Sequence, residues 1–292
     1  MYLFSVLLLG AVAFHEPNWN EKFPRINDRP VMGVLTHSSS AGREYFSSDY
    51  VKFLRSAGAR VVPLRYTLSS EALRQEMAKL NGVLVTGGGD VLSIGDELTP
   101  FTKSVKVVLD FSKEEMENGR YFPVWGTCMG LEAFFIALSE TRALGYSDAN
   151  DVLMPLHFQR NPKHTNMFRE FPDYLLKNLA KNPLTYHAHD RGVPLDFYND
   201  KELNLKSIFN VLATSRDPSG QEIVVAVSHT SLPIYAVMFH PEKALFDFDP
   251  AKKIPHEPDA IELGVNLANF LVFESRRSPL RYDYAELVHA EI

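Results

Sequence analysis

The sequence predicts an α/β fold in which a mostly parallel central sheet carries helices on both faces. Two observations predict it. Short apolar runs recur along residues 31–125, and the stretches between them carry apolar residues every three or four positions. Strands that alternate with helices in this way lie parallel, because a right-handed helical crossover brings the chain back to start the next strand in the same direction.

The first half of the chain supplies the parallel strands and their helices. The expected strands are residues 31–36, 61–64, 83–86 and 122–125, and the expected helices are residues 50–57, about 70–80, and a stretch around 105–109 that ends near residue 119. We expect Asp49 to cap the first helix and Ser69 or Ser70 the second, because short polar side chains accept hydrogen bonds from free N–H groups. Pro63 indicates an edge strand, since proline has no N–H to donate.

The second half is less regular. Extended segments are expected at residues 154–158, 184–189, 223–227 and 234–239, and helices at residues 172–179, at 201–208 and from about residue 259 until Pro279. The strands 223–227 and 234–239 flank a turn region, so we expect them to pair antiparallel. The last helix is expected to turn Ile261, Val265, Leu267 and Leu271 toward the core. No linker divides the chain, so residues 30–279 are predicted to form one domain, with residues 280–292 as a tail.

The composition is that of an ordinary folded protein. The chain has 292 residues, of which 45% are hydrophobic and 23% charged, and a net charge of -6. These values exclude a disordered or collagen-like chain. No block of five or six basic residues occurs, so a nucleic-acid partner is not expected. A single cysteine excludes an intrachain disulfide.

Residues 1–14 form an uncharged apolar run with Ala-Val-Ala at residues 11–13. This small-x-small pattern predicts a signal peptide and entry into the secretory pathway, followed by a polar leader at residues 15–29. The run is shorter than the roughly 20 apolar residues that a membrane-spanning helix needs. The alternative is a buried N-terminal strand.

The candidate nucleophile is the lone cysteine. Residues 126–130 read Gly-Thr-Cys-Met-Gly and lie between a predicted strand and the apolar helical run 131–138. This is the cysteine form of the nucleophile elbow, in which flanking glycines permit a sharp turn and close packing. Helix-end donors would favour the thiolate of Cys128, and the N–H of Met129 would face an acyl oxyanion. The alternative is an inert buried cysteine.

A proton-transfer partner is expected from residues 240–242, which read His-Pro-Glu after a late apolar strand. A histidine that leaves the carboxyl edge of the same sheet would emerge beside Cys128. Glu242 can then orient the imidazole of His240, which completes a catalytic triad.

Taken together, these motifs resemble the class I glutamine amidotransferase superfamily, and more specifically the gamma-glutamyl hydrolase (folylpoly-gamma-glutamate hydrolase) family. The stretches that carry the resemblance are residues 29–35, 50–63, 81–84, 121–130 and 240–244. The resemblance implies a flavodoxin-like three-layer sandwich and a cysteine hydrolase that cleaves gamma-glutamyl bonds of folylpolyglutamates through a thioester. It implies no metal or cofactor, a small-molecule substrate, and a secreted, lysosomal or vacuolar location.

Carried over residue by residue, the resemblance assigns Cys128 as the nucleophile and His240 as the proton-transfer residue. It places His189 near the site, where a purely structural histidine is the alternative, and puts an acid at Glu132 that would orient the elbow helix or contact substrate. The glycine-rich stretch 87–90 departs from the family, yet we expect Gly88 to supply a second oxyanion N–H.

Several alternatives remain open. One is a glutaminase, which normally needs a synthase partner that this chain lacks. Others are another gamma-glutamyl peptidase, a non-catalytic binding protein on the same fold, and a zinc enzyme built on His187, His189 and Asp190. Candidates for binding the carboxylates of a polyglutamate are Arg43, Arg160 and Lys163. The oligomeric state is left open, a homodimer included.

Overall fold

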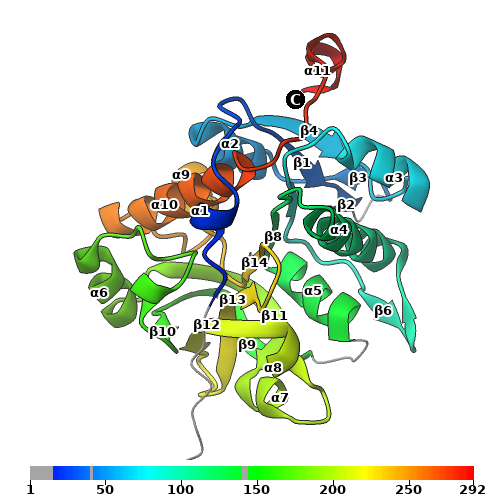
Figure 1. Ribbon diagram of the computed structural model, residues 1–292. Helices are drawn as coiled ribbons and strands as arrows, with labels where there is room; N and C mark the ends of the chain where they lie inside the picture. Colours follow the sequence, from blue (N-terminus) through cyan, green and yellow to red (C-terminus); the bar gives the residue numbers. More distant parts are fainter. Residues whose placement is uncertain (1–15, 40–41, 140–143) are drawn as a thin grey trace, which may run out of the picture.

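The computed structural model describes residues 16–39, 42–139 and 144–292; the predicted signal peptide, residues 1–14, lies outside them. Within the described residues the main sheet has 10 strands. Helices cover both of its faces, with α3, α4 and α5 on one side and α2, α9 and α10 on the other (Figure 1). The predicted α/β class with a mostly parallel central sheet is confirmed.

The parallel part of the sheet has the order β14-β8-β5-β1-β4. Its strands are β1 (Val31–Leu35), β4 (Arg60–Leu64), β5 (Val83–Val85), β8 (Val124–Thr127) and β14 (Ile234–Val237). β4 lies at the edge, as Pro63 predicted. Val237 of β14 pairs with Thr127 of β8, so the residues that follow both strands leave the sheet at the same edge.

Antiparallel strands extend the sheet beyond β14. They are β13 (Glu222–His229), β12 (Phe209–Arg216) and β10 (His157–Phe158), while β11 (Thr185–Pro194) pairs with β13 and with β9 (Gly145–Met154). The predicted antiparallel pairing of β13 with β14 is confirmed. Of the expected helix at residues 201–208, only the last four residues are helical, as α8 (Leu205–Ile208); residues 201–204 form a turn, and an unexpected short helix, α7 (Leu195–Asn199), precedes it.

The principal helices follow the predicted order, except that the four-residue helix at residues 243–246 was not expected. They are α2 (Ser48–Ser56), α3 (Ser70–Met77), α4 (Pro100–Glu117), α5 (Met129–Ser139), α6 (Asp173–Lys181), α9 (Lys243–Phe246) and α10 (Pro258–Ser275). The shorter elements are β2 (His37–Ser38), β3 (Glu44–Tyr45), β6 (Ser93–Ile94), β7 (Glu97–Leu98) and η1 (Pro162–His164). No helix in the described part of the chain is both long enough and apolar enough to cross a membrane.

Three local predictions need correction. Ser47, not Asp49, caps α2, because its hydroxyl accepts the N–H of Asp49. β8 begins at Val124 and not at residue 122, since Pro123 has no N–H to contribute to the ladder.

The third correction concerns the buried face of α10. Ile261 and Val265 are 37% and 41% exposed, although both were expected in the core. The buried stripe runs through Leu263, Leu267 and Leu271, which stand four residues apart and therefore share one helix face.

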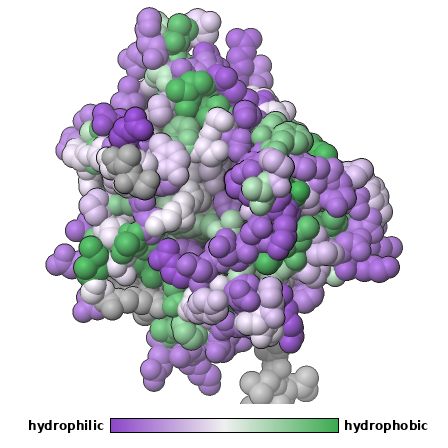
Figure 2. Space-filling view, turned by 180° about the vertical axis from the view of Figure 1, so that it is seen from behind, coloured by the Kyte–Doolittle hydropathy of each residue, from purple (hydrophilic) through white to green (hydrophobic). Residues whose placement is uncertain are grey.

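The first and last described segments of the chain both pack on the domain. The leader forms α1 (Trp19–Lys22), and the Trp19 ring lies edge-on to Tyr121, 5.7 Å between centroids. The tail forms α11 (Tyr284–Ala290), after which Glu291 pairs with Arg60 of β4. On the face shown in Figure 2, apolar and hydrophilic side chains are interspersed.

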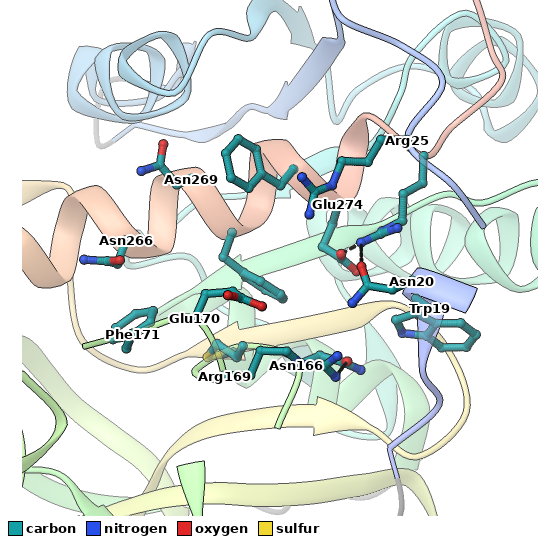
Figure 3. Close-up of a pocket in the computed structure, with 14 residues that line it drawn as sticks. Trp19, Asn20, Arg25, Asn166, Arg169, Glu170, Phe171, Asn266, Asn269 and Glu274 are labelled. Atoms are coloured by element: carbon teal, nitrogen blue, oxygen red, sulfur yellow. Dashed lines mark hydrogen bonds and ion pairs between the residues drawn. The ribbon is translucent and has the colours of Figure 1, made fainter. Parts of the chain in front are cut away.

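A cavity of about 140 Å³ lies beside the C-terminal half of α10 (Figure 3). Its buried carboxylate, Glu274, accepts hydrogen bonds from Arg277 at 2.9 Å, Tyr235 at 3.3 Å and Tyr121. The other half of α10 faces the sheet edge, where a Cβ at Gly264 would lie 2.6 Å from the carbonyl oxygen of Pro241. Ten residues of helix, about 15 Å, therefore separate Glu274 from the residues around His240.

Candidate active site

Cys128 occupies a strained turn between β8 and α5. Its φ is 53°, in the left-handed region that residues other than glycine rarely adopt, and the residue is 3% exposed. The N–H of Cys128 donates to the carbonyl of Val237 at 2.8 Å, which ties the turn to β14. This is the geometry of a nucleophile elbow.

The two glycines that flank the elbow are needed for close packing. A Cβ at Gly126 would lie 2.8 Å from the Phe134 ring, and one at Gly130 would lie 2.5 Å from the carbonyl oxygen of Val85. Real Cβ atoms do not approach this closely, so the elbow depends on glycine at both positions, as the motif predicted.

The start of α5 presents backbone donors next to the thiol. The Cys128 carbonyl accepts the N–H groups of Leu131 at 2.9 Å and Glu132 at 3.2 Å. The N–H groups of Met129 and Gly130 therefore belong to the first helical turn and have no partner within the helix. The positive end of the α5 dipole also lies here and favours an anion.

His240 and Cys128 converge on one point of the backbone. A Cβ placed on Gly87 would lie 2.8 Å from Cε1 of His240 and 3.2 Å from Cβ of Cys128. The charge of Cys128 is also close enough to contribute to the raised pKa of His240. β11 supports His240 from behind, because the carbonyl of Tyr186 accepts the His240 N–H at 2.9 Å.

Glu242 holds the second ring nitrogen. Nδ1 of His240 lies 2.7 Å from Oε1 of Glu242, and the two residues are 6% and 1% exposed. Burial lowers the pKa of His240, but the negative charges of Glu242 and Cys128 outweigh it and raise that pKa to about 10. The imidazole is therefore cationic at neutral pH, with Nδ1–H directed to Glu242 and Nε2 left for the sulfur.

Tyr50 is a site residue that the motifs did not reveal. Its hydroxyl accepts the N–H of Gly87 at 2.8 Å, and burial, followed by the nearby charges of Glu242 and Cys128, raises its pKa well above 10. The residue stands in the first turn of α2, far along the chain from Gly87. The only sequence feature that could have identified Tyr50 is its place in the family-like stretch 50–63, because its contact with Gly87 is tertiary.

The expected second oxyanion donor, Gly88, lies beside the first. A Cβ at Gly88 would be 2.7 Å from Cε of Met129 and 2.8 Å from Cε1 of His37. The N–H of Gly87 is committed to Tyr50, whereas that of Gly88 makes no hydrogen bond with a described residue. Gly88 therefore lies against the side chain of Met129, with an N–H group that no described residue occupies.

Glu132 lies one turn beyond Cys128 on α5 and is 3% exposed. Burial raises the pKa of its carboxyl to about 7, opposed by Arg191 and reinforced by Asp190. Nη2 of Arg191 lies 4.0 Å from Oε2 of Glu132. This arginine was not among the predicted substrate residues.

His189 is fully committed inside the protein. Its Nε2 lies 3.0 Å from Nδ1 of His187, and its Nδ1 lies 2.7 Å from the carbonyl oxygen of Arg191. Nε2 of His187 lies 2.9 Å from the Thr185 hydroxyl. Burial lowers the pKa of His189 to about 4. Neither of its ring nitrogens is directed at a substrate, so its place is behind the site and not in it.

The remaining candidates are dispersed. Lys163 donates to the carbonyl of Phe171 and pairs with Asp173 at 3.2 Å, while Arg43 lies before β3 and Arg160 before η1. Among the residues that the structure describes, no group of three or more His, Cys, Asp or Glu side chains is arranged to hold a metal ion.

The chain is similar in sequence to known hydrolases. Residues 30–242 match the peptidase C26 family. Gamma-glutamyl hydrolase of Rattus norvegicus is 34% identical over 95% of this chain and 87% of its own length. The Homo sapiens enzyme is 36% identical over 86% of this chain and 79% of its own. Gamma-glutamyl hydrolase 1 of Arabidopsis thaliana is 34% identical over 94% of this chain and 80% of its own length.

Solved structures with a similar fold include a glutaminase domain. The glutaminase domain of Trypanosoma brucei CTPS superposes with a TM-score of 0.52 at 15% identity, covering 88% of this chain and 98% of that domain. A chain of PurLQS from Thermotoga maritima superposes with a TM-score of 0.50 at 16% identity, covering 83% of this chain and 99% of its own length. At these identities the likeness shows the fold.

Proposed function

Because the chain belongs to the peptidase C26 family of gamma-glutamyl hydrolases, we propose that it hydrolyses gamma-glutamyl bonds with Cys128 as the nucleophile. The observation that supports this assignment most directly is the meeting of Cys128 and His240 against Gly87. The strained elbow supports it too, since backbone strain of this kind concentrates at functional sites.

In the acylation step, the thiolate of Cys128 attacks the gamma-carbonyl carbon of the substrate. The N–H groups of Met129 and Gly88 stabilise the resulting oxyanion, and each such donor is worth roughly 3 to 4 kcal/mol of barrier. Cationic His240 then gives its proton to the departing alpha-nitrogen of the next residue, and a thioester remains on Cys128.

In the deacylation step, His240 takes a proton from water, and the hydroxide attacks the thioester carbonyl. A second oxyanion forms in the same place and collapses to release the gamma-carboxylate and the thiolate. Glu242 stabilises the imidazolium in both steps and keeps Nε2 directed at the reacting atoms.

The proposed substrates are folylpoly-gamma-glutamates, and the proposed location is the secretory pathway, with a secreted, lysosomal or vacuolar destination. The apolar run 1–14 with its Ala-Val-Ala pattern supports export. Residues 30–279 are then the catalytic domain. Ammonia transfer to a synthase would be of little use after export, which favours hydrolysis over a glutaminase role.

The test is to incubate the purified protein with folylpentaglutamate and with free glutamine, and to separate the products. We expect shortened folylpolyglutamates and free glutamate or gamma-glutamyl peptides, little ammonia from glutamine, and no cleavage by Cys128→Ala. Folded protein that releases ammonia from glutamine and leaves the folylpentaglutamate intact would support the glutaminase alternative instead.

A further inference from the structure

A partly exposed arginine, Arg191, lies beside Glu132, one helical turn from the candidate nucleophile. Strand β11 passes behind His240 at Tyr186 and, five residues later, brings Arg191 beside Glu132. Glu132 is one helical turn from Cys128 on α5, and the guanidinium of Arg191 lies next to this turn.

The guanidinium is only loosely paired with its neighbours. Its side chain is 39% exposed, and its N–H groups donate to no described residue within hydrogen-bond distance. Nε lies 3.7 Å from Asp190, whose side chain is 81% exposed, and Nη2 lies 4.0 Å from Glu132. Solvent screens the first of these charges, and the pKa of Glu132, about 7, leaves the second carboxyl largely protonated in weak acid.

The backbone that carries Arg191 is held in place by the buried histidines. Its carbonyl accepts from Nδ1 of His189 at 2.7 Å, and Nε2 of His189 is in turn held by His187 at 3.0 Å. The β9–β11 pairing is irregular between His189 and Arg191, which redirects the strand at this point. His189 therefore acts as a positioning residue for Arg191.

We propose that Arg191 binds the alpha-carboxylate of the glutamyl residue whose gamma-carbonyl is attacked by Cys128. This inference rests on the proposed function. Three carbon atoms separate the two carboxyl carbons of glutamate, so a substrate bound at the thiol extends its alpha-carboxylate toward the neighbouring helical turn, where Glu132 and Arg191 lie. A guanidinium can bind a carboxylate through two parallel hydrogen bonds, which fixes both position and orientation.

The test compares two substrates, gamma-glutamyl p-nitroanilide and the same compound with its alpha-carboxylate replaced by a carboxamide. We expect the native protein to prefer the carboxylate by about 10- to 100-fold in kcat/KM, the range expected for a hydrogen-bonded charge pair. Arg191→Gln should reduce that preference to near unity, mainly by lowering kcat/KM for the substrate that carries the carboxylate. Arg191→Lys should keep part of it.

Arg216→Gln is the matched control, because Arg216 is an arginine on β12 that pairs with Glu222 at 3.9 Å and should leave the preference unchanged. An Arg191→Gln variant that discriminates like the native protein would overturn the proposal. If the native protein cleaves neither compound but shortens folylpentaglutamate, the proposed function stands; if it cleaves none of the three, the proposed function fails. Calorimetry of both compounds binding to Cys128→Ala, with and without Arg191→Gln, then decides the Arg191 assignment by itself.

Discussion

Nδ1 of His240 lies 2.7 Å from Oε1 of Glu242, and both residues are almost completely buried. A carboxylate in this position fixes the ring and its tautomer, so that the opposite nitrogen is the one that meets Cys128. It also keeps the ring cationic, because a buried negative charge at this distance stabilises the protonated form more than burial disfavours it.

Glu242→Gln should impair catalysis and change the pH dependence of stability. The raised His240 pKa, about 10 against an ordinary 6.5, means that protonation stabilises the folded state below pH 6.5 and that this stability is lost as pH rises toward 10. In the variant, the free energy of unfolding should change much less between pH 7 and pH 9.5, measured by urea unfolding. Turnover should fall by about 10²- to 10⁴-fold. An unchanged pH dependence of stability would show that Glu242 does not hold the charge of His240.

Gly87→Ala tests whether the two catalytic side chains meet where the structure places them. The added methyl would lie 2.7 Å from the Tyr50 hydroxyl and 2.8 Å from Cε1 of His240, so it must displace one of them. We expect a loss of turnover of about 10²-fold, since small displacements at reacting groups are costly. Gly89→Ala, which has open space for its Cβ, is the control and should keep native kcat. Equal activity of the two variants would contradict the geometry.

Glu132→Gln should stabilise the protein in a pH-dependent way. A carboxyl whose pKa rises from 4.5 to about 7 on folding binds more protons in the folded state, so the free energy of unfolding falls as pH rises between these values. The decrease corresponds to about 3 kcal/mol. Relative to the native protein, the variant should gain little unfolding free energy at pH 4.5 and most above pH 7, measured by urea denaturation. A gain that does not vary with pH would disprove the assigned pKa.

Two substitutions of the nucleophile should reveal the strain of the elbow. With φ at 53°, Cys128→Ala keeps an unfavourable backbone conformation, whereas Cys128→Gly relieves it. We expect the glycine variant to be about 1 kcal/mol more stable than the alanine variant in urea melts. Both should be inactive. A glycine variant less stable than the alanine variant would argue against stored strain.

The parts of the fold that the sequence predicted are those with strong local signals. The elbow at residues 126–130 combines a strand, two glycines and an apolar helix within a short window, and the structure has each of them. Strand β9 was mostly missed because its residues 145–151 are largely polar and alternate in burial, which gives little apolar periodicity. On α10, apolar residues occur all round the helix, so the sequence did not distinguish the exposed Val265 from the buried Leu267.

The contacts that complete the site are tertiary and left no local pattern. Tyr50 and Gly87 stand 37 positions apart, and Arg191 reaches Glu132 only because β11 crosses behind His240. The hydrogen bonds that occupy both ring nitrogens of His189 come from a neighbouring histidine and a backbone carbonyl, which spacing alone does not predict.

The sequence contains one cysteine, and that residue is the proposed nucleophile. Every sulfhydryl in a purified sample is then an active site. A thiol-reactive dye small enough to enter would titrate competent molecules one for one. A single oxidation of this thiol would inactivate a molecule, and the chain has no second cysteine that could resolve the oxidised sulfur by forming a disulfide.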